Sequence, residues 1–269
     1  MEVIKKEIYY KKANSEFKLY AIGDTHCGTI HCTEHDLKRK VHEIKESKNT
    51  YWIGMGDYAE FITPSDPRWD GGGIAEWVDK EDIGYSQEQW VINLFRPIKD
   101  KCIGMLTGNH EHSIFKHSHQ NVQKHITDAL GVPNLGYSSF VHLNFKRENS
   151  NERHLIKGAF THGAGAAITP GAKVNNLMRF MYSFDADIYG YAHIHDYIPK
   201  SFTRLGTSDK GRIVNKVVIG ATTGSWFRTY TQGIHFSYGE MKVYPPNELC
   251  SAMFTINPNT GHLDVQRST

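Results

Sequence analysis

Residues 101–111 read KCIGMLTGNHE, an apolar stretch that runs directly into a Gly-Asn-His-Glu cluster. The apolar part, Lys101 to Leu106, predicts a short buried strand. Glycine gives the turn after this strand the freedom to present both Asn109 and His110. Asparagine seldom binds metals other than hard or borderline cations, so the cluster indicates a metal-dependent site at the end of a strand.

The same arrangement recurs four more times along the chain. Apolar segments predict further strands at residues 17–23, 50–54, 154–161 and 186–191. The metal-capable residues that follow these strands are Asp24 with His26, Asp57, His162, and His193 with His195. In sheets of this kind, ligands gather at the carboxyl ends of the strands. The five clusters therefore predict one site assembled from distant parts of the chain.

The remaining pattern predicts helices and strands within a single domain, residues 1–269. Helices are expected after Thr33, from a Ser86/Gln89 capping box to Leu94, at 119–130 with Gly131 as its stop, and at 175–182. Further strands are expected at 140–145, 213–219, 234–243 and 250–256, and residues 196–269 are expected to complete the second sheet.

Residues 58–85 are expected to be an irregular insertion, because they contain Pro64, Pro67 and the Gly71–Gly73 run. A loop of this length inside a compact domain usually covers or shapes a site. We therefore expect the segment to form a mobile flap or rim that sets substrate choice.

Composition limits the classes of protein that remain. With 39% hydrophobic and 22% charged residues, the chain is typical of soluble globular proteins, and its net charge of +2 gives no basic signature. The four cysteines form no C-x-x-C pair, so we expect reduced thiols. The first twelve residues lack the apolar core of a secretory signal, and no apolar run is long enough for a membrane span. We expect a cytoplasmic protein that does not associate with membranes.

The ordered motifs D-x-H, G-D, G-N-H-E, His and H-x-H resemble those of the calcineurin-like metallophosphoesterase family, particularly its bacterial and phage-type members and DNA-repair exonuclease-like phosphodiesterases. The resemblance spans residues 24–195. It implies an α/β (α+β) fold, a four-layer αββα sandwich of two mixed β-sheets flanked by helices.

The resemblance also implies a role for each motif residue. One divalent metal would be held by Asp24, His26 and His195, and a second by Asn109, His162 and His193. Asp57 would bridge the two metals, and a metal-bridging hydroxide would attack phosphorus. Mixed nitrogen and oxygen ligation suits Mn²⁺, Fe or Zn²⁺, and availability decides between them; we expect Mn²⁺ first, with Fe, Zn²⁺, Ni²⁺ and Mg²⁺ as alternatives.

His110 would act as general acid, a role suited to an imidazole that titrates near neutrality. Glu60 occupies the fourth place of the segment that begins Gly56-Asp57, where it could orient His110. No Arg-Gly follows Glu60, a departure from phosphoprotein phosphatases that weakens a protein phosphatase interpretation.

We therefore expect a metal-dependent phosphoesterase, and a phosphodiesterase or nuclease before a phosphomonoesterase of a small metabolite or phosphoprotein. A metal-binding scaffold without catalysis is the third alternative. The partner would be a phosphoester substrate. Nucleic acid is a candidate because aromatic and basic residues could stack bases and contact phosphates, although the near-neutral charge argues against it. These residues are Trp69, Trp77, Trp226, Arg228 and Lys116.

Overall fold

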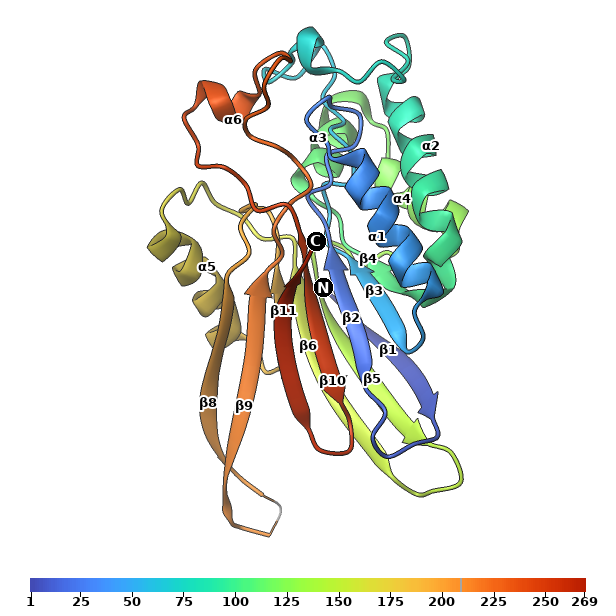
Figure 1. The fold of residues 1–269 in the computed structure, drawn as a ribbon, viewed down its shortest axis with the longest axis vertical. Helices are drawn as coiled ribbons and strands as arrows, with labels where there is room; N and C mark the ends of the chain where they lie inside the picture. Colours follow the sequence, from blue (N-terminus) through green and yellow to red (C-terminus); the bar gives the residue numbers. More distant parts are fainter. Residues whose placement is uncertain (209) are drawn as a thin grey trace.

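Two mixed β-sheets pack face to face, and helices cover the outer face of each sheet in this computed structural model, which describes residues 1–208 and 210–269 (Figure 1). One sheet has the order β1 (Glu2–Tyr10), β5 (Ser138–Arg147), β6 (Arg153–Thr161), β7 (Ile188–Tyr191), β9 (Ile213–Thr222), β8 (Pro199–Thr207). The other has the order β11 (His262–Ser268), β10 (Ser251–Asn257), β2 (Phe17–Ile22), β3 (Thr50–Gly54), β4 (Cys102–Met105). The four-layer αββα sandwich expected from the sequence is confirmed.

The helices lie on opposite sides of the paired sheets (Figure 1). They are α1 (Glu34–Glu46), α2 (Ile83–Phe95), α3 (Asn109–Ser118), α4 (Val122–Leu130), α5 (Pro170–Ser183) and α6 (Tyr238–Met241), with short 3₁₀ turns η1 (Gly71–Gly73) and η2 (Arg96–Lys101). Helices α1, α2 and α4 cover the five-stranded sheet, whereas α5 covers the six-stranded sheet. None of the helices in the described residues has the length and apolar character needed to cross a bilayer.

Three apolar cores separate the four layers. Alternation along β5 buries Val141, Leu143 and Phe145 between the two sheets, since successive side chains of a strand point to opposite faces. Trp52 of β3 stacks on Phe95 of α2 with ring centroids 4.7 Å apart, in the core beneath the helices of the five-stranded sheet. The third core joins α5 to the outer face of the six-stranded sheet. These cores fix the strand ends on which the site is built.

Several helix boundaries differ from those predicted, because the residues that cap a helix, and not its hydrophobic periodicity, decide where it begins and ends. Helix α2 begins at Ile83, since the Asp82 side chain accepts a hydrogen bond from Tyr85 N, and the expected Ser86 capping box lies inside the helix. The predicted helix at 119–130 instead starts at Val122. Helix α3, which was not predicted, ends at Ser118. His119 caps it in the left-handed conformation, with a φ of 55°.

The C-terminal part of the chain also differs from expectation. The predicted strand at 234–243 is wrong, because this segment is irregular apart from the short helix α6. Strands β8 and β9 extend the six-stranded sheet, whereas β10 and β11 belong to the five-stranded sheet. The C-terminal strands are therefore divided between both sheets and do not complete only one. Strands β1, β8 and β11 were not predicted from the sequence.

The packing of Phe160 against Gly190 gives a test of this architecture. A Cβ atom at Gly190 would lie 2.6 Å from the Phe160 ring, which is fully buried, so we expect Gly190→Ala to lower the free energy of unfolding by about 1–3 kcal/mol. The control is Gly206→Ala in β8, where the nearest atom would be 3.9 Å away. Denaturant unfolding of both variants makes the comparison, and equal stability of the two would contradict this packing.

Candidate metal centre

The polar clusters meet because the strands that precede them are parallel neighbours. β2, β3 and β4 run parallel within one sheet, and β6 and β7 run parallel within the other. Backbone hydrogen bonds then join the turns that follow β2 and β3: Asp24 N donates to Gly56 O at 2.9 Å, and His26 N donates to Asp57 O at 3.1 Å. The expected convergence of the five clusters at one edge is present.

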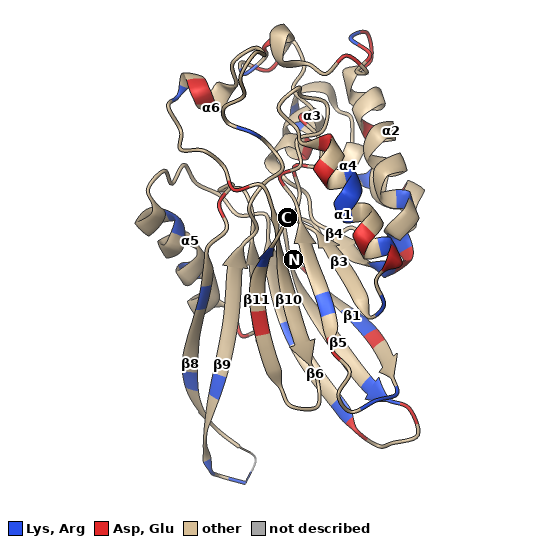
Figure 2. Ribbon diagram, in the orientation of Figure 1, with Lys and Arg blue, Asp and Glu red and all other residues tan. Residues whose placement is uncertain are grey.

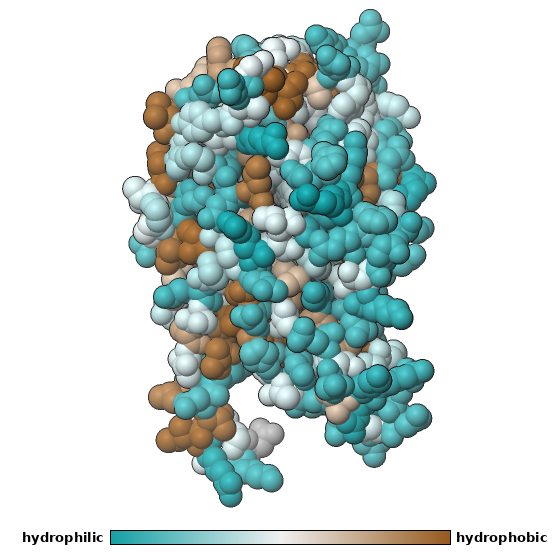
Figure 3. All heavy atoms as spheres, viewed as in Figure 1, coloured by the Kyte–Doolittle hydropathy of each residue, from teal (hydrophilic) through white to brown (hydrophobic). Residues whose placement is uncertain are grey.

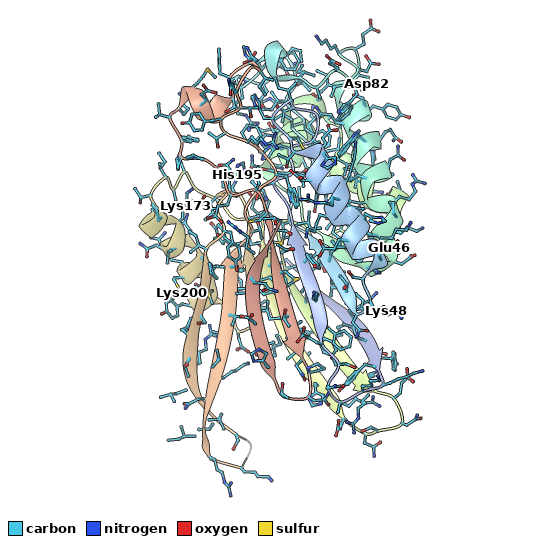
Figure 4. All side chains as sticks on the ribbon, in the orientation of Figure 1. Glu46, Lys48, Asp82, Lys173, His195 and Lys200 are labelled. Atoms are coloured by element: carbon cyan, nitrogen blue, oxygen red, sulfur yellow. The ribbon has the colours of Figure 1, made fainter. Side chains whose placement is uncertain are left out.

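The first group of potential ligands is Asp24, His26 and His195, whose ligand atoms all lie within 4.8 Å of one another. The Nε2 atoms of His26 and His195 are 3.2 Å apart, and Asp24 Oδ1 lies 3.4 Å from His195 Nε2. Figure 4 labels His195 among the loops beyond the strand ends. These are the three residues expected to hold one metal.

The second group is Asp57, His162 and His193, again with ligand atoms within 4.8 Å of one another. His162 Nε2 lies 3.3 Å from Asp57 Oδ2 and 2.9 Å from the Asn109 side-chain oxygen. His162 Nδ1 donates to Met55 O at 2.8 Å, which directs Nε2 towards the group. Asn109, His162 and His193 therefore lie together, with Asp57 beside them.

The turns of the site adopt a backbone conformation that ordinary residues avoid. Asp24, His26, Asp57, His193 and His195 all have positive φ, between 44° and 71°. Such left-handed residues are strained and persist where surrounding contacts determine the conformation, frequently at functional sites. Five of the seven predicted ligands share this conformation.

A buried carboxylate, Glu111, holds two of the turns together. It accepts hydrogen bonds from Asp57 N at 2.9 Å, Tyr58 N at 2.8 Å and Gly108 N at 2.8 Å. Burial, and then the Asp57 charge, raise the pKa of Glu111 to about 7. A Cβ at Gly108 would lie only 2.1 Å from Asp57 Oδ1, so this close approach requires glycine.

The charges at the site favour a cation. Asp24 and Asp57 are 0% and 1% exposed. Burial alone raises the pKa of both carboxylates, but the surrounding imidazoles outweigh it and hold each pKa below its usual value. Within the described residues, Asp24 Oδ1 has no hydrogen-bond partner although it is buried. Buried carboxylates are normally paired or bound to metals, so this donor set fits divalent cations.

Glu60 makes a different contact from the one expected. Its carboxylate accepts a hydrogen bond from His26 Nδ1 at 2.9 Å, whereas His110 Nδ1 donates to its backbone carbonyl. Burial raises the pKa of Glu60, but His110 and His26 more than offset this and lower it to about 2. The carboxylate therefore orients a predicted metal ligand, and the backbone of the same residue orients His110.

A cavity of about 350 Å³ opens beside both ligand groups. Besides the ligands, its lining includes Arg68, Lys173, Phe227, Tyr238, Tyr244 and Asn247. Lys173 pairs with Asp196 at 2.6 Å and is labelled near His195 in Figure 4. Exposed apolar residues of the adjoining segment, Phe236, Met241 and Val243, contribute to the apolar area around α6 in Figure 3.

The aromatic and basic residues proposed for nucleic-acid contact lie mostly elsewhere. Trp226 is buried in the core beneath the helices, Trp69 packs within the 58–85 segment, and Trp77 stacks on Trp90 of α2 with ring centroids 5.4 Å apart. Arg228 lies 3.9 Å from Asp36, and Lys116 is exposed on α3. The ring at the metal centre is instead Phe227, whose centroid is 5.4 Å from that of His26.

The roles of three site residues were not predicted from the sequence. Arg68 comes from the irregular 58–85 segment and contacts His110, and the Asn247 amide lies 3.1 Å from His195 Nδ1. Neither belongs to a motif, so their positions depend on how long loops fold back over the strand ends. Glu111 stood within the G-N-H-E motif, but nothing in the sequence indicated which amides it would bind.

No family model and no curated protein matches the sequence. Among solved structures the chain is similar to a metallophosphoesterase from Sphaerobacter thermophilus, with 10% identity, a TM-score of 0.39, and coverage of 94% of this chain and 88% of that one. It is also similar to Chaetomium thermophilum Vps29 (11% identity, TM-score 0.39, 94% of each chain). A third similar structure is a predicted phosphoesterase from Streptococcus pneumoniae, with 11% identity, a TM-score of 0.36, and coverage of 94% of this chain and 98% of that one.

The two ligand groups predict two bound divalent metals per chain. Asp57→Asn should weaken both, because its carboxylate is assigned between them, whereas His26→Ala should empty mainly one site. Elemental analysis after Mn²⁺ reconstitution measures both effects. A stoichiometry that stays at or below one in the unmodified protein would rule out a binuclear centre.

The Glu60–His26 contact predicts a selective effect on one site. Glu60→Ala should weaken binding at the Asp24/His26/His195 group by about 10–100-fold, because the His26 ring loses the partner that orients it. Competition with a metal-sensitive dye would measure the two affinities separately. Equal weakening of both sites would argue against this role, and exposed Glu76→Ala is the control.

Proposed function

We propose that this protein is a binuclear metal-dependent phosphoester hydrolase. The observation that carries the proposal is the pair of ligand groups, one around Asp24 and one around Asp57, opening on the same cavity as His110. Two metals in such a pair would stabilise charge on the phosphoryl oxygens and lower the pKa of a bound water.

The predicted ligands would bind the two metals as two groups that share Asp57. Asp24, His26 and His195 would hold one metal, and Asn109, His162 and His193 the other. Asp57 would contribute to both. The backbone of His193 donates to Asp24 Oδ2 at 2.9 Å, which ties the two groups together before any metal binds. A site held in this way can bind its ligand with little rearrangement.

His110 is placed to act on the leaving group. Because Nδ1 donates to the Glu60 carbonyl, Nε2 is left to face the cavity, where it lies 4.0 Å from Asp57 Oδ2. Burial lowers the pKa of His110, but Asp57 and Glu60 outweigh burial and raise it above its usual value. A protonated imidazole beside the phosphoryl position could donate a proton to the departing oxygen.

Of the phosphoesters, we favour a phosphodiester. The cavity wall formed by Ile168, Phe227, Tyr238 and Tyr244 offers apolar contacts for organic groups on the phosphate. Lysines and arginines are scattered among acidic residues along the ribbon in Figure 2, and the net charge of the chain is only +2. This supports a small diester, or a short single strand, over a long duplex.

Activity with bis-p-nitrophenyl phosphate, p-nitrophenyl phosphate, and single- and double-stranded DNA would test the proposal after metal reconstitution. We expect the diester to be hydrolysed faster than the monoester. A faster monoester would favour the phosphomonoesterase alternative, and no activity with bound metals would favour a non-catalytic scaffold.

The role of His110 predicts dependence on the leaving group. His110→Asn should lose about 10²–10⁴-fold on an alkyl ester, whose alkoxide needs a proton, and much less on a nitrophenyl ester. Metal content should barely change. The matched control is His112→Asn, since His112 lies exposed on the same helix. Equal losses on both esters together with metal loss would show that His110 is a metal ligand.

A further inference from the structure

Arg68 is held rigidly at the edge of the cavity by residues with no assigned role. Its Nε and Nη2 atoms donate to the two oxygens of Asp66 at 3.0 and 2.7 Å, and Nη2 also lies 3.2 Å from Ser113 Oγ. Asp66 is 6% exposed and accepts further bonds from Arg68 N and Ser113 Oγ, both at 2.9 Å. A bidentate pair of this kind fixes the plane of the guanidinium.

The remaining nitrogen of this guanidinium points to the proposed general acid. Arg68 Nη1 lies 3.3 Å from His110 Nε2, and both residues line the cavity. Asp66 and Ser113 account for the hydrogens on Nε and Nη2. When His110 is protonated at Nε2 it cannot accept from Arg68, so the hydrogens on Nη1 are left for another acceptor beside His110 Nε2.

We propose that Arg68 is a catalytic residue that donates a hydrogen bond to the leaving-group oxygen of the substrate, beside His110. This inference rests on the proposed function, because His110 Nε2 marks where the leaving oxygen lies. Asp66 and Ser113 are positioning residues, since they act only by fixing the guanidinium. The guanidinium of Arg68 is cationic whatever its partner, so Asp66 contributes its orientation and not its charge.

The proposed step accounts for every bond. A water-derived oxygen bonds to phosphorus, and the ester P–O bond breaks with its electron pair on the leaving oxygen. That oxygen takes the proton from His110 Nε2, and the proton released by the attacking water restores His110. Arg68 transfers no proton. It stabilises the negative charge that develops on the leaving oxygen before proton transfer is complete, as fixed donors do elsewhere.

Two donors at one oxygen indicate a class of substrate. An aliphatic alkoxide is a poor leaving group that gains from both a proton and a fixed cation, whereas a phenolate or a phosphate leaves with little help. We therefore infer that the natural leaving group is an aliphatic alcohol, such as a sugar or glycerol hydroxyl, and that the substrate is an ester and not an anhydride.

The test measures hydrolysis of diesters whose leaving groups range from p-nitrophenol to simple alkyl alcohols. Arg68→Ala in the metal-loaded protein should lose about 10²-fold in kcat on alkyl esters and less than about tenfold on nitrophenyl esters, with unchanged metal content. Arg68→Lys keeps the charge without the planar fork and should lose less, and Asp66→Asn should show the same dependence on the leaving group in weaker form. The control is Arg179→Ala, an exposed arginine of α5.

If Arg68→Ala lost activity equally on all leaving groups, the inference would be overturned, as it would be by an effect confined to KM.

A second test combines Arg68→Ala with His110→Asn. If both residues act on one oxygen, the double variant should lose less than the product of the two single losses, and independent effects would contradict the assignment. If His110→Asn behaves as expected while Arg68→Ala matches the control, only this inference fails. An unmodified protein that hydrolyses no ester would refute the proposed function and this inference with it.

Discussion

Two carboxylates buried close together are the constraint around which the structure is organised. Asp24 and Asp57 are almost wholly removed from solvent, and removing a single charge from water costs several kcal/mol even after relaxation. That cost must be offset by positive charge, and the five other predicted ligands around the two aspartates are four imidazoles and one amide. The surrounding imidazoles offset part of this cost, and the same donor set fits divalent cations.

The rest of the fold serves to keep this arrangement in place. Parallel strands bring the turns to one edge, and three apolar cores hold the strands. Glu111 then fastens the turn after β3 to the turn after β4 through three backbone amides. The left-handed conformations of Asp24, Asp57 and three histidines show that backbone strain is concentrated at the site, where the surrounding contacts compensate for it.

Features that depend on local sequence could be predicted, whereas features that depend on how long loops fold could not. Strand ends that carry Asp, Asn and His are visible as local patterns, so the meeting of these residues at one site could be predicted from the sequence. The four-layer fold was implied by the resemblance of the motifs to a known family. The roles of Glu60 and Arg68 could not be predicted, because they depend on how residues 58–85 fold back over the strand ends. Segment 234–243 alternates like a strand, yet it pairs with no strand among the described residues, and Ser237 caps the short helix α6 instead.

The chemistry expected of the site follows from its composition: two ligand groups, with His110 and Arg68 beside them at the same cavity. The central claim is that two metals occupy the groups around Asp24 and Asp57, and an anomalous difference map from Mn²⁺-loaded crystals tests it most directly. The account predicts two peaks, roughly 3.5–4 Å apart, with Asp57 in contact with both. A single peak, or peaks that do not contact Asp57, would contradict it.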